Sequence, residues 1–124
     1  MVFFWIFVAG GAGSICRYLL GTLVQARAHA DFPVGTLAVN VLGCVAIGLI
    51  GKYFLHSQTQ LLTRTALMAG FCGGFTTFSA FSYETLGLIT GGAWGRAMAY
   101  VALTTIACVL GTAAGFAYGP TMNP

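Results

Sequence analysis

The stretch Gly70-Phe71-Cys72-Gly73-Gly74-Phe75-Thr76-Thr77-Phe78-Ser79-Ala80-Phe81-Ser82 decides how this chain of 124 residues is expected to fold. It lies in the middle of an apolar segment that runs from about Leu61 to Thr90. As one straight helix that segment would be ~45 Å long, which exceeds the ~30 Å hydrocarbon core of a bilayer. Adjacent glycines and threonines are poor helix formers. We therefore predict that the helix breaks near Gly73–Thr77.

A break at membrane depth frees backbone carbonyl and amide groups, which cannot face lipid. Discontinuous membrane helices of this kind bind ions, so the break predicts an ion or water site enclosed by protein. Phe78 and Phe81 follow it three residues apart, on one face of the next helix. The positive ring edges of this pair could attract a small anion, although ordinary packing would explain two phenylalanines equally well.

The composition of the rest of the chain is also typical of a membrane protein. Hydrophobic residues make up 58% and charged residues 6% of the sequence, whereas a soluble domain carries about 25% charged residues. Together with the segment above, three further apolar segments give approximate spans at 3–23, 33–54, 61–90 and 96–118. The N-terminal residues contain no Lys or Arg before residue 10, so we expect a retained span rather than a cleaved signal peptide. We predict an all-α membrane protein, with one integral domain over residues 1–124, four transmembrane helices and the third helix broken at mid-membrane.

The charges that flank the spans do not determine which way the chain is oriented in the membrane. With four spans, Lys52 and Arg64 lie on one side of the membrane, and Arg27 and Arg96 lie on the other. The excess of Lys and Arg in cytoplasmic loops normally sets orientation, and here the count is two against two. We expect the chain to insert both ways and to pair as an antiparallel dimer, or else to take one orientation for a subtler reason.

Polar residues follow two of the spans at four-residue spacing. They are Thr36, Asn40, Cys44 and Gly48 on the second span, and Tyr100, Thr104, Cys108 and Thr112 on the fourth. Each set places hydroxyl, amide or thiol groups along one helix face. An asparagine in mid-span is unfavourable unless paired, and its NH₂ group offers two hydrogen-bond donors to an anion. Hydrogen bonding between helices is the alternative explanation for both stripes.

Two charged residues, Arg17 and Glu84, lie within the predicted spans. Such residues are candidates for function, and Arg17 could pair with Glu84 or line a vestibule. The four cysteines, Cys16, Cys44, Cys72 and Cys108, lie in apolar segments without a CxxC pair. We expect them to be small buried thiols that pack between helices.

Four stretches resemble the small fluoride channels of the Fluc, or CrcB, family. They are Gly10-Gly11-Ala12-Gly13-Ser14-Ile15-Cys16-Arg17-Tyr18, then Pro33-Val34-Gly35-Thr36-Leu37-Ala38-Val39-Asn40-Val41-Leu42-Gly43, then Gly70 to Ser82, and Glu84. With the chain length and the four spans, the similarity covers nearly the whole chain. One difference is Cys108, which stands where the family pattern leads us to expect Ser or Thr.

The resemblance implies a passive, fluoride-specific channel that lowers cytoplasmic fluoride and lies in a bacterial plasma or inner membrane. It implies an antiparallel homodimer with dual topology and a structural sodium ion on the dimer axis, held by the backbone carbonyls of Gly73 and Thr76. The residues that it places on the fluoride pathway are Asn40, Phe78, Phe81, Tyr100 and Thr104, with Ser79 as a weaker candidate. Arg17 and Glu84 are implied to be vestibule or structural residues.

Other functions remain open from the sequence. A small proton-coupled multidrug exporter with dual topology would also have four spans, and Glu84 would be its only intramembrane carboxylate. A subunit that transports nothing would need neither the break nor the polar stripes. We expect no enzyme, because no nucleophile–base pair or metal cluster is evident, and we expect no nucleic-acid partner.

Overall fold

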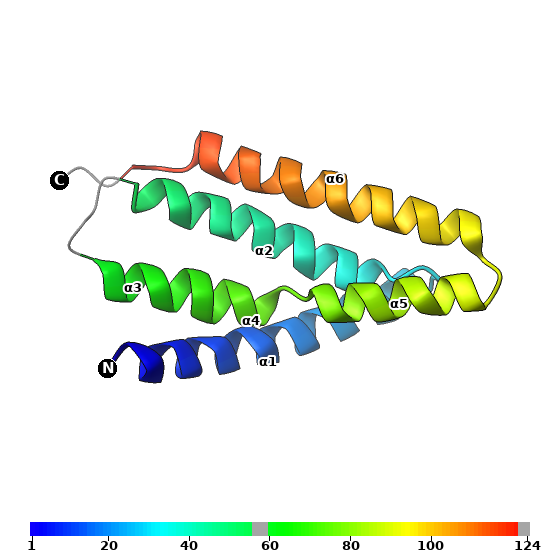
Figure 1. Cartoon of the computed structure of the whole chain (residues 1–124), viewed down its shortest axis with the longest axis horizontal. Helices are drawn as coiled ribbons and strands as arrows, with labels where there is room; N and C mark the ends of the chain where they lie inside the picture. The colour runs from blue at the N-terminus through cyan, green and yellow to red at the C-terminus, as the bar shows by residue number, and fades with distance from the viewer. Residues whose placement is uncertain (56–59, 122–124) are drawn as a thin grey trace.

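The computed structural model describes residues 1–55 and 60–121, and within them every regular element is a helix (Figure 1). The elements are α1 (Val2–Ala28), α2 (Val34–Tyr53), α3 (Leu61–Thr65), the π-helical η1 (Ala66–Cys72), α4 (Gly73–Phe75), α5 (Phe78–Thr90) and α6 (Trp94–Tyr118). The expectation of an all-α chain with four helical crossings and an interrupted third crossing is confirmed.

Three of the helices, α1, α2 and α6, are each long and apolar enough to cross a membrane. The remaining crossing is assembled from α3, η1, α4 and α5, which follow one another along one path in Figure 1. α1 continues to Ala28, beyond the predicted end near residue 23. The predicted second span begins at residue 33, whereas in the structure Pro33 is the N-cap residue and α2 begins at Val34.

The third crossing is interrupted at two residues, Thr76 and Thr77, which have extended backbones with ψ angles of 158° and 117°. The interruption falls inside the predicted range, but it is shorter, because Gly73 and Gly74 remain helical. Gly74 has a different role: a Cβ atom there would collide with the carbonyl oxygen of Gly10 on α1. The glycine therefore permits close helix packing, and the threonines carry the break.

The four crossings pack as two close pairs. α1 lies against η1 and α4, and α2 lies against α6, to which it runs parallel in Figure 1. The α2–α6 crossing is tight because a Cβ on Gly48 would collide with the Thr112 carbonyl, and one on Gly115 with the Val45 carbonyl. Small residues that let backbones approach are a general means of helix association in lipid. The packing brings the two polar stripes of α2 and α6 onto facing sides of one interface.

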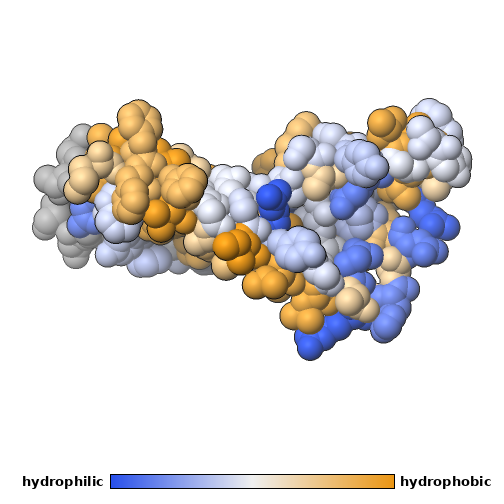
Figure 2. Space-filling model, turned by 90° about the horizontal axis from the view of Figure 1, so that it is seen from below, coloured by the Kyte–Doolittle hydropathy of each residue, from blue (hydrophilic) through white to orange (hydrophobic). Residues whose placement is uncertain are grey.

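Large apolar side chains cover the outside of the bundle. Phe3, Phe7 and Ile15 on α1, and Met98 and Leu110 on α6, are mostly exposed. Figure 2 shows hydrophobic atoms over much of one face, while hydrophilic atoms gather toward the end that holds the α1–α2 connection. This distribution is the one expected for a bundle whose sides face lipid and whose end faces water.

Candidate functional site

The helix break is held by a side chain from α2. The Asn40 Oδ1 accepts from the Thr77 backbone N–H at 2.7 Å, and the Asn40 Nδ2 donates to the Thr77 carbonyl oxygen at 3.0 Å. Asn40 and Thr77 are both buried, with 6% and 7% exposure. The Thr77 hydroxyl in turn accepts from the Ala80 backbone N–H and caps the first turn of α5. Asn40 thus satisfies both backbone groups that the break exposes at this residue, as a buried backbone requires.

A cavity of about 310 Å³, which we call the break cavity, opens beside the two Asn40–Thr77 hydrogen bonds. Its lining residues come from α2, the break, α5 and α6, and they are Asn40, Cys44, Thr76, Thr77, Phe78, Phe81, Thr104, Thr105, Cys108 and Val109. These residues carry hydroxyl, amide and thiol groups together with two phenyl rings, and none of them is charged. The break cavity can therefore offer neutral donors and ring edges to a small anion.

Phe78 and Phe81 lie together on one side of the break cavity, as the sequence predicted. Their ring centroids are 5.3 Å apart. Phe81 is buried and also packs against the Tyr100 ring, whereas Phe78 is 78% exposed at the surface of this chain. One ring is therefore fixed by the bundle, and the other stands at its edge.

Thr104 faces the break cavity from α6. The side chain is buried, and its Oγ1 has no hydrogen-bond partner within the part of the chain that the structure describes. A buried hydroxyl without a partner is unfavourable by about 1–3 kcal/mol. Because Thr104 lines the break cavity, a small molecule or ion that enters the cavity would be close to this unpaired hydroxyl.

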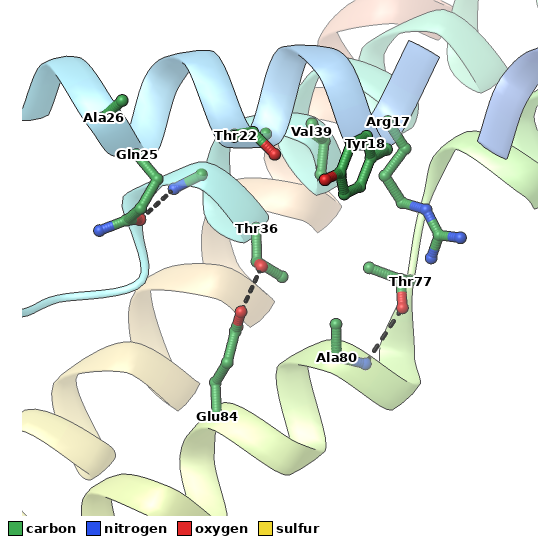
Figure 3. Close-up of a pocket in the computed structure, with 12 residues that line it drawn as sticks. Arg17, Tyr18, Thr22, Gln25, Ala26, Thr36, Val39, Thr77, Ala80 and Glu84 are labelled. Carbon is green, nitrogen blue, oxygen red and sulfur yellow. Dashed lines mark hydrogen bonds between the residues drawn. The ribbon is translucent and has the colours of Figure 1, made fainter. Parts of the chain in front are cut away.

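A larger cavity of about 590 Å³, which we call the vestibule, lies on the α1 side of the break. Arg17 and Glu84 both line it, and Thr77 is shared with the break cavity. In Figure 3 Arg17 and Glu84 point from different sides of the space. The Glu84 carboxylate accepts from the Thr36 hydroxyl at 2.6 Å and from the Tyr100 hydroxyl at 2.7 Å. The partners of Glu84 are thus two hydroxyls, and the Arg17–Glu84 pair that we considered is not the contact that forms.

The other predicted site residues have different surroundings. Tyr100 is fully buried, and its hydroxyl is directed to Glu84 and not to the break cavity. Ser79 is exposed, and its hydroxyl lies 3.2 Å from that of Thr77. Thr76 lines the break cavity, and Gly73 is exposed one turn earlier. The Thr77 N–H, which would bond the Gly73 carbonyl in a continuous helix, donates to Asn40 instead.

Sequence reasoning missed two residues of this site. Thr36 was placed on the α2 stripe, but its bond to Glu84 was not foreseen, because the partners are 48 positions apart. Thr77 was expected only to weaken the helix, although threonine is also a favoured N-cap residue. The preference of threonine for the N-cap position could have identified Thr77 as the cap of α5, whose hydroxyl accepts from the Ala80 N–H three residues later.

The cysteines only partly match the expectation of buried packing thiols. Cys72 is buried, with 1% exposure, but Cys16 is exposed on α1. Cys44 and Cys108 are half-buried and line the break cavity. The expectation was wrong for Cys16, which lies on a face of α1 that no other helix of the described residues covers.

Comparison with known proteins is consistent with this geometry. Residues 4–116 match the family described as CrcB-like protein, Camphor Resistance (CrcB). The chain is 44% identical over 110 residues to a protein of Sorangium cellulosum named Fluoride-specific ion channel FluC, covering 86% of this chain and 85% of that one. It is 47% identical over 113 residues to a protein of the same name from Geobacter sulfurreducens, covering 89% and 90% of the two chains. The resemblance noted from the sequence is thereby confirmed, and this multi-pass membrane chain belongs to the CrcB family.

Proposed function

We propose that this chain forms a passive, fluoride-specific channel that lets fluoride leave the cell and lowers its cytoplasmic concentration. The observation that carries the proposal is the buried Thr104 hydroxyl without a partner, which shares the break cavity with the rings of Phe78 and Phe81. The names of the relatives supply the identity of the anion. A channel of this kind is not an enzyme.

The chemistry of the break cavity suits a small, strongly hydrated anion. Such an ion must exchange its water for other donors, and the Thr104 hydroxyl is one donor that the protein leaves free. The positive edges of the Phe78 and Phe81 rings would supply further weak attraction. Conduction needs sites that bind weakly enough to release the ion. A cavity lined by uncharged residues meets that need better than one lined by Lys or Arg.

Asn40 contributes to this pathway in two ways. One Nδ2 hydrogen and the Oδ1 hold Thr77, which fixes the shape of the break. An amide NH₂ carries two hydrogens, so the second is available to an ion in the cavity that Asn40 lines. Tyr100 acts mainly by position, since its buried ring supports Phe81 and its hydroxyl holds Glu84.

The functional unit that we propose is an antiparallel homodimer with dual topology. The balanced flanking charges support it, and so does Phe78, whose large exposed fraction would be covered by a second copy. A structural sodium ion would lie on the dimer axis. The carbonyl of Gly73, which loses its helical donor to Asn40, and that of Thr76 would be its ligands, and oxygen ligands suit such a hard cation. Reporters fused to the C-terminus should give signal on both sides of the membrane, and signal on one side alone would refute dual topology.

A proton-coupled multidrug exporter is not favoured. Its cycle would need a carboxylate free to bind a proton or a cationic drug, and both Glu84 oxygens already accept hydrogen bonds from hydroxyls. The relatives described above carry the name of a fluoride channel and not that of an exporter.

Fluoride efflux from liposomes that contain only the purified protein tests the proposed pathway through two matched variants. Thr104→Val removes the free hydroxyl. A hydrogen bond to a charged group is worth about 1.5–3 kcal/mol, so fluoride efflux should fall roughly tenfold to a hundredfold. Thr85→Val is the control, because the Thr85 hydroxyl donates to the Phe81 carbonyl of its own helix. Equal efflux from the two variants would remove Thr104 from the pathway.

A further inference from the structure

Two cysteines from different helices lie in the wall of the break cavity. Cys44 on α2 and Cys108 on α6 both line it, and the two helices pack tightly one turn further on, where Gly48 lies against the Thr112 carbonyl. Both thiols are free and half-buried. They lie one turn beyond Asn40 and Thr104 on the facing polar stripes, so the thiol pair follows the free Thr104 hydroxyl along the cavity.

The other two cysteines have no such setting. Cys16 is exposed on the outside of α1, and Cys72 is buried, with neither of them lining the break cavity. The Cys44–Cys108 pair is therefore a feature of the cavity and not a consequence of a cysteine-rich chain. Two thiols in the wall of one cavity provide a ligand set for a metal ion that prefers sulfur.

We propose that Cys44 and Cys108 form a two-thiolate site for a soft, monovalent metal ion such as Ag(I) or Cu(I), and that an ion bound there closes the break cavity to anions. Each thiol gives up its proton to water, and the two thiolate sulfurs become the ligands of the ion. Two neutral thiols and one monovalent cation thus become a complex with one net negative charge, with two protons released.

The charge of that complex explains the closure. One helical turn is ~5.4 Å, so the complex would lie about that far from the Thr104 hydroxyl. At the effective dielectric of a protein, two unit charges near this separation repel strongly enough to lower the occupancy of the second roughly a hundredfold. A second negative ion would then be disfavoured at Thr104 by electrostatics, in addition to the space that the metal occupies. The effect on flux rests on the proposed fluoride function, whereas metal binding does not.

The binding test uses the full-length protein in detergent with silver nitrate in a buffer free of chloride. Silver retained per chain after desalting is compared for the unmodified protein, Cys44→Ser, Cys108→Ser and the control Cys16→Ser. Joining two ligands in one site strengthens binding by roughly 10²–10⁴-fold over either ligand alone. The unmodified protein and Cys16→Ser should therefore retain silver at concentrations where Cys44→Ser and Cys108→Ser lose it. Equal retention by all four proteins would overturn the proposal.

The flux test uses the same four proteins in liposomes, each compared with its own efflux of fluoride in the absence of silver. Silver should suppress fluoride efflux through the unmodified protein and Cys16→Ser, and a small dithiol should restore that efflux. Efflux through Cys44→Ser and Cys108→Ser should be unaffected by silver. Silver bound as expected without suppression of efflux would refute closure of the cavity. Absence of efflux before silver is added would refute the fluoride function alone, because the binding measurement would still decide whether the thiol site exists.

Discussion

Replacing Asn40 by leucine, which has a similar shape, removes the side chain that holds the helix break. The substitution deletes both hydrogen bonds to Thr77 and leaves its N–H and carbonyl groups buried without partners. Each such orphan group is unfavourable by about 1–3 kcal/mol, so the free energy of unfolding should fall by about 2–6 kcal/mol. Side-chain hydrogen bonds in membrane proteins average about 0.6 kcal/mol, so two bonds without the penalty for orphan groups would account for only about 1 kcal/mol. A loss below about 1 kcal/mol would contradict the role assigned to Asn40.

The measurement is reversible unfolding of the purified protein in mixed micelles, with increasing dodecyl sulfate and helicity as the readout. Ser82→Ala is the control on α5, because the Ser82 hydroxyl is exposed and donates only to the Phe78 carbonyl of its own helix. We expect the control to match the unmodified protein. If Asn40→Leu unfolds like the control while fluoride efflux is lost, Asn40 is only an ion ligand, and its hydrogen bonds to Thr77 do not stabilise the break.

Three further predictions concern the rings, the helix crossing and the carboxylate. Phe78→Ile should lower fluoride efflux up to about tenfold, because an aromatic contact is worth about 0.5–1.5 kcal/mol, and it should leave unfolding unchanged because this ring is largely exposed. Phe81→Ile should lower both fluoride efflux and the free energy of unfolding. The reverse pattern between the two variants would contradict the placement of Phe78 at the edge of the bundle and of Phe81 inside it. Gly115→Ala should destabilise the protein by about 1–3 kcal/mol in the micelle assay, whereas Gly87→Ala, where a Cβ meets open space, should not; equal stability would disprove the tight α2–α6 crossing. Glu84→Gln should retain most of the fluoride efflux, with no response to an imposed proton gradient, because an amide can still bond both hydroxyls; loss of gradient-driven transport in this variant would instead support an exporter.

The features that could be predicted from the sequence are those that depend on local composition. Four spans follow from runs of apolar residues, and the pairing of Phe78 with Phe81 follows from helical spacing. The break was located approximately because glycine and threonine both disfavour helices. The sequence did not indicate whether the glycines or the threonines would leave the helical conformation, since that depends on the contact of Gly74 with Gly10 across the bundle.

The features that could not be predicted join residues far apart in the chain. Asn40 and Thr77 are separated by 37 positions, and Thr36 and Glu84 by 48. Spacing placed Asn40 on a polar stripe and suggested a donor for an anion, but it gave no partner. The structure adds that partner, and with it a reason for a polar residue in mid-membrane that holds even without an ion.

The proposal that fluoride crosses the membrane through the break cavity is tested most directly by a fluoride-selective electrode outside liposomes that contain only this protein. Fluoride should flow out rapidly down its gradient once a potassium ionophore removes the opposing voltage, and chloride from matched liposomes should not. Protein that is shown to be folded and inserted, yet releases no fluoride above empty liposomes, would contradict the fluoride function.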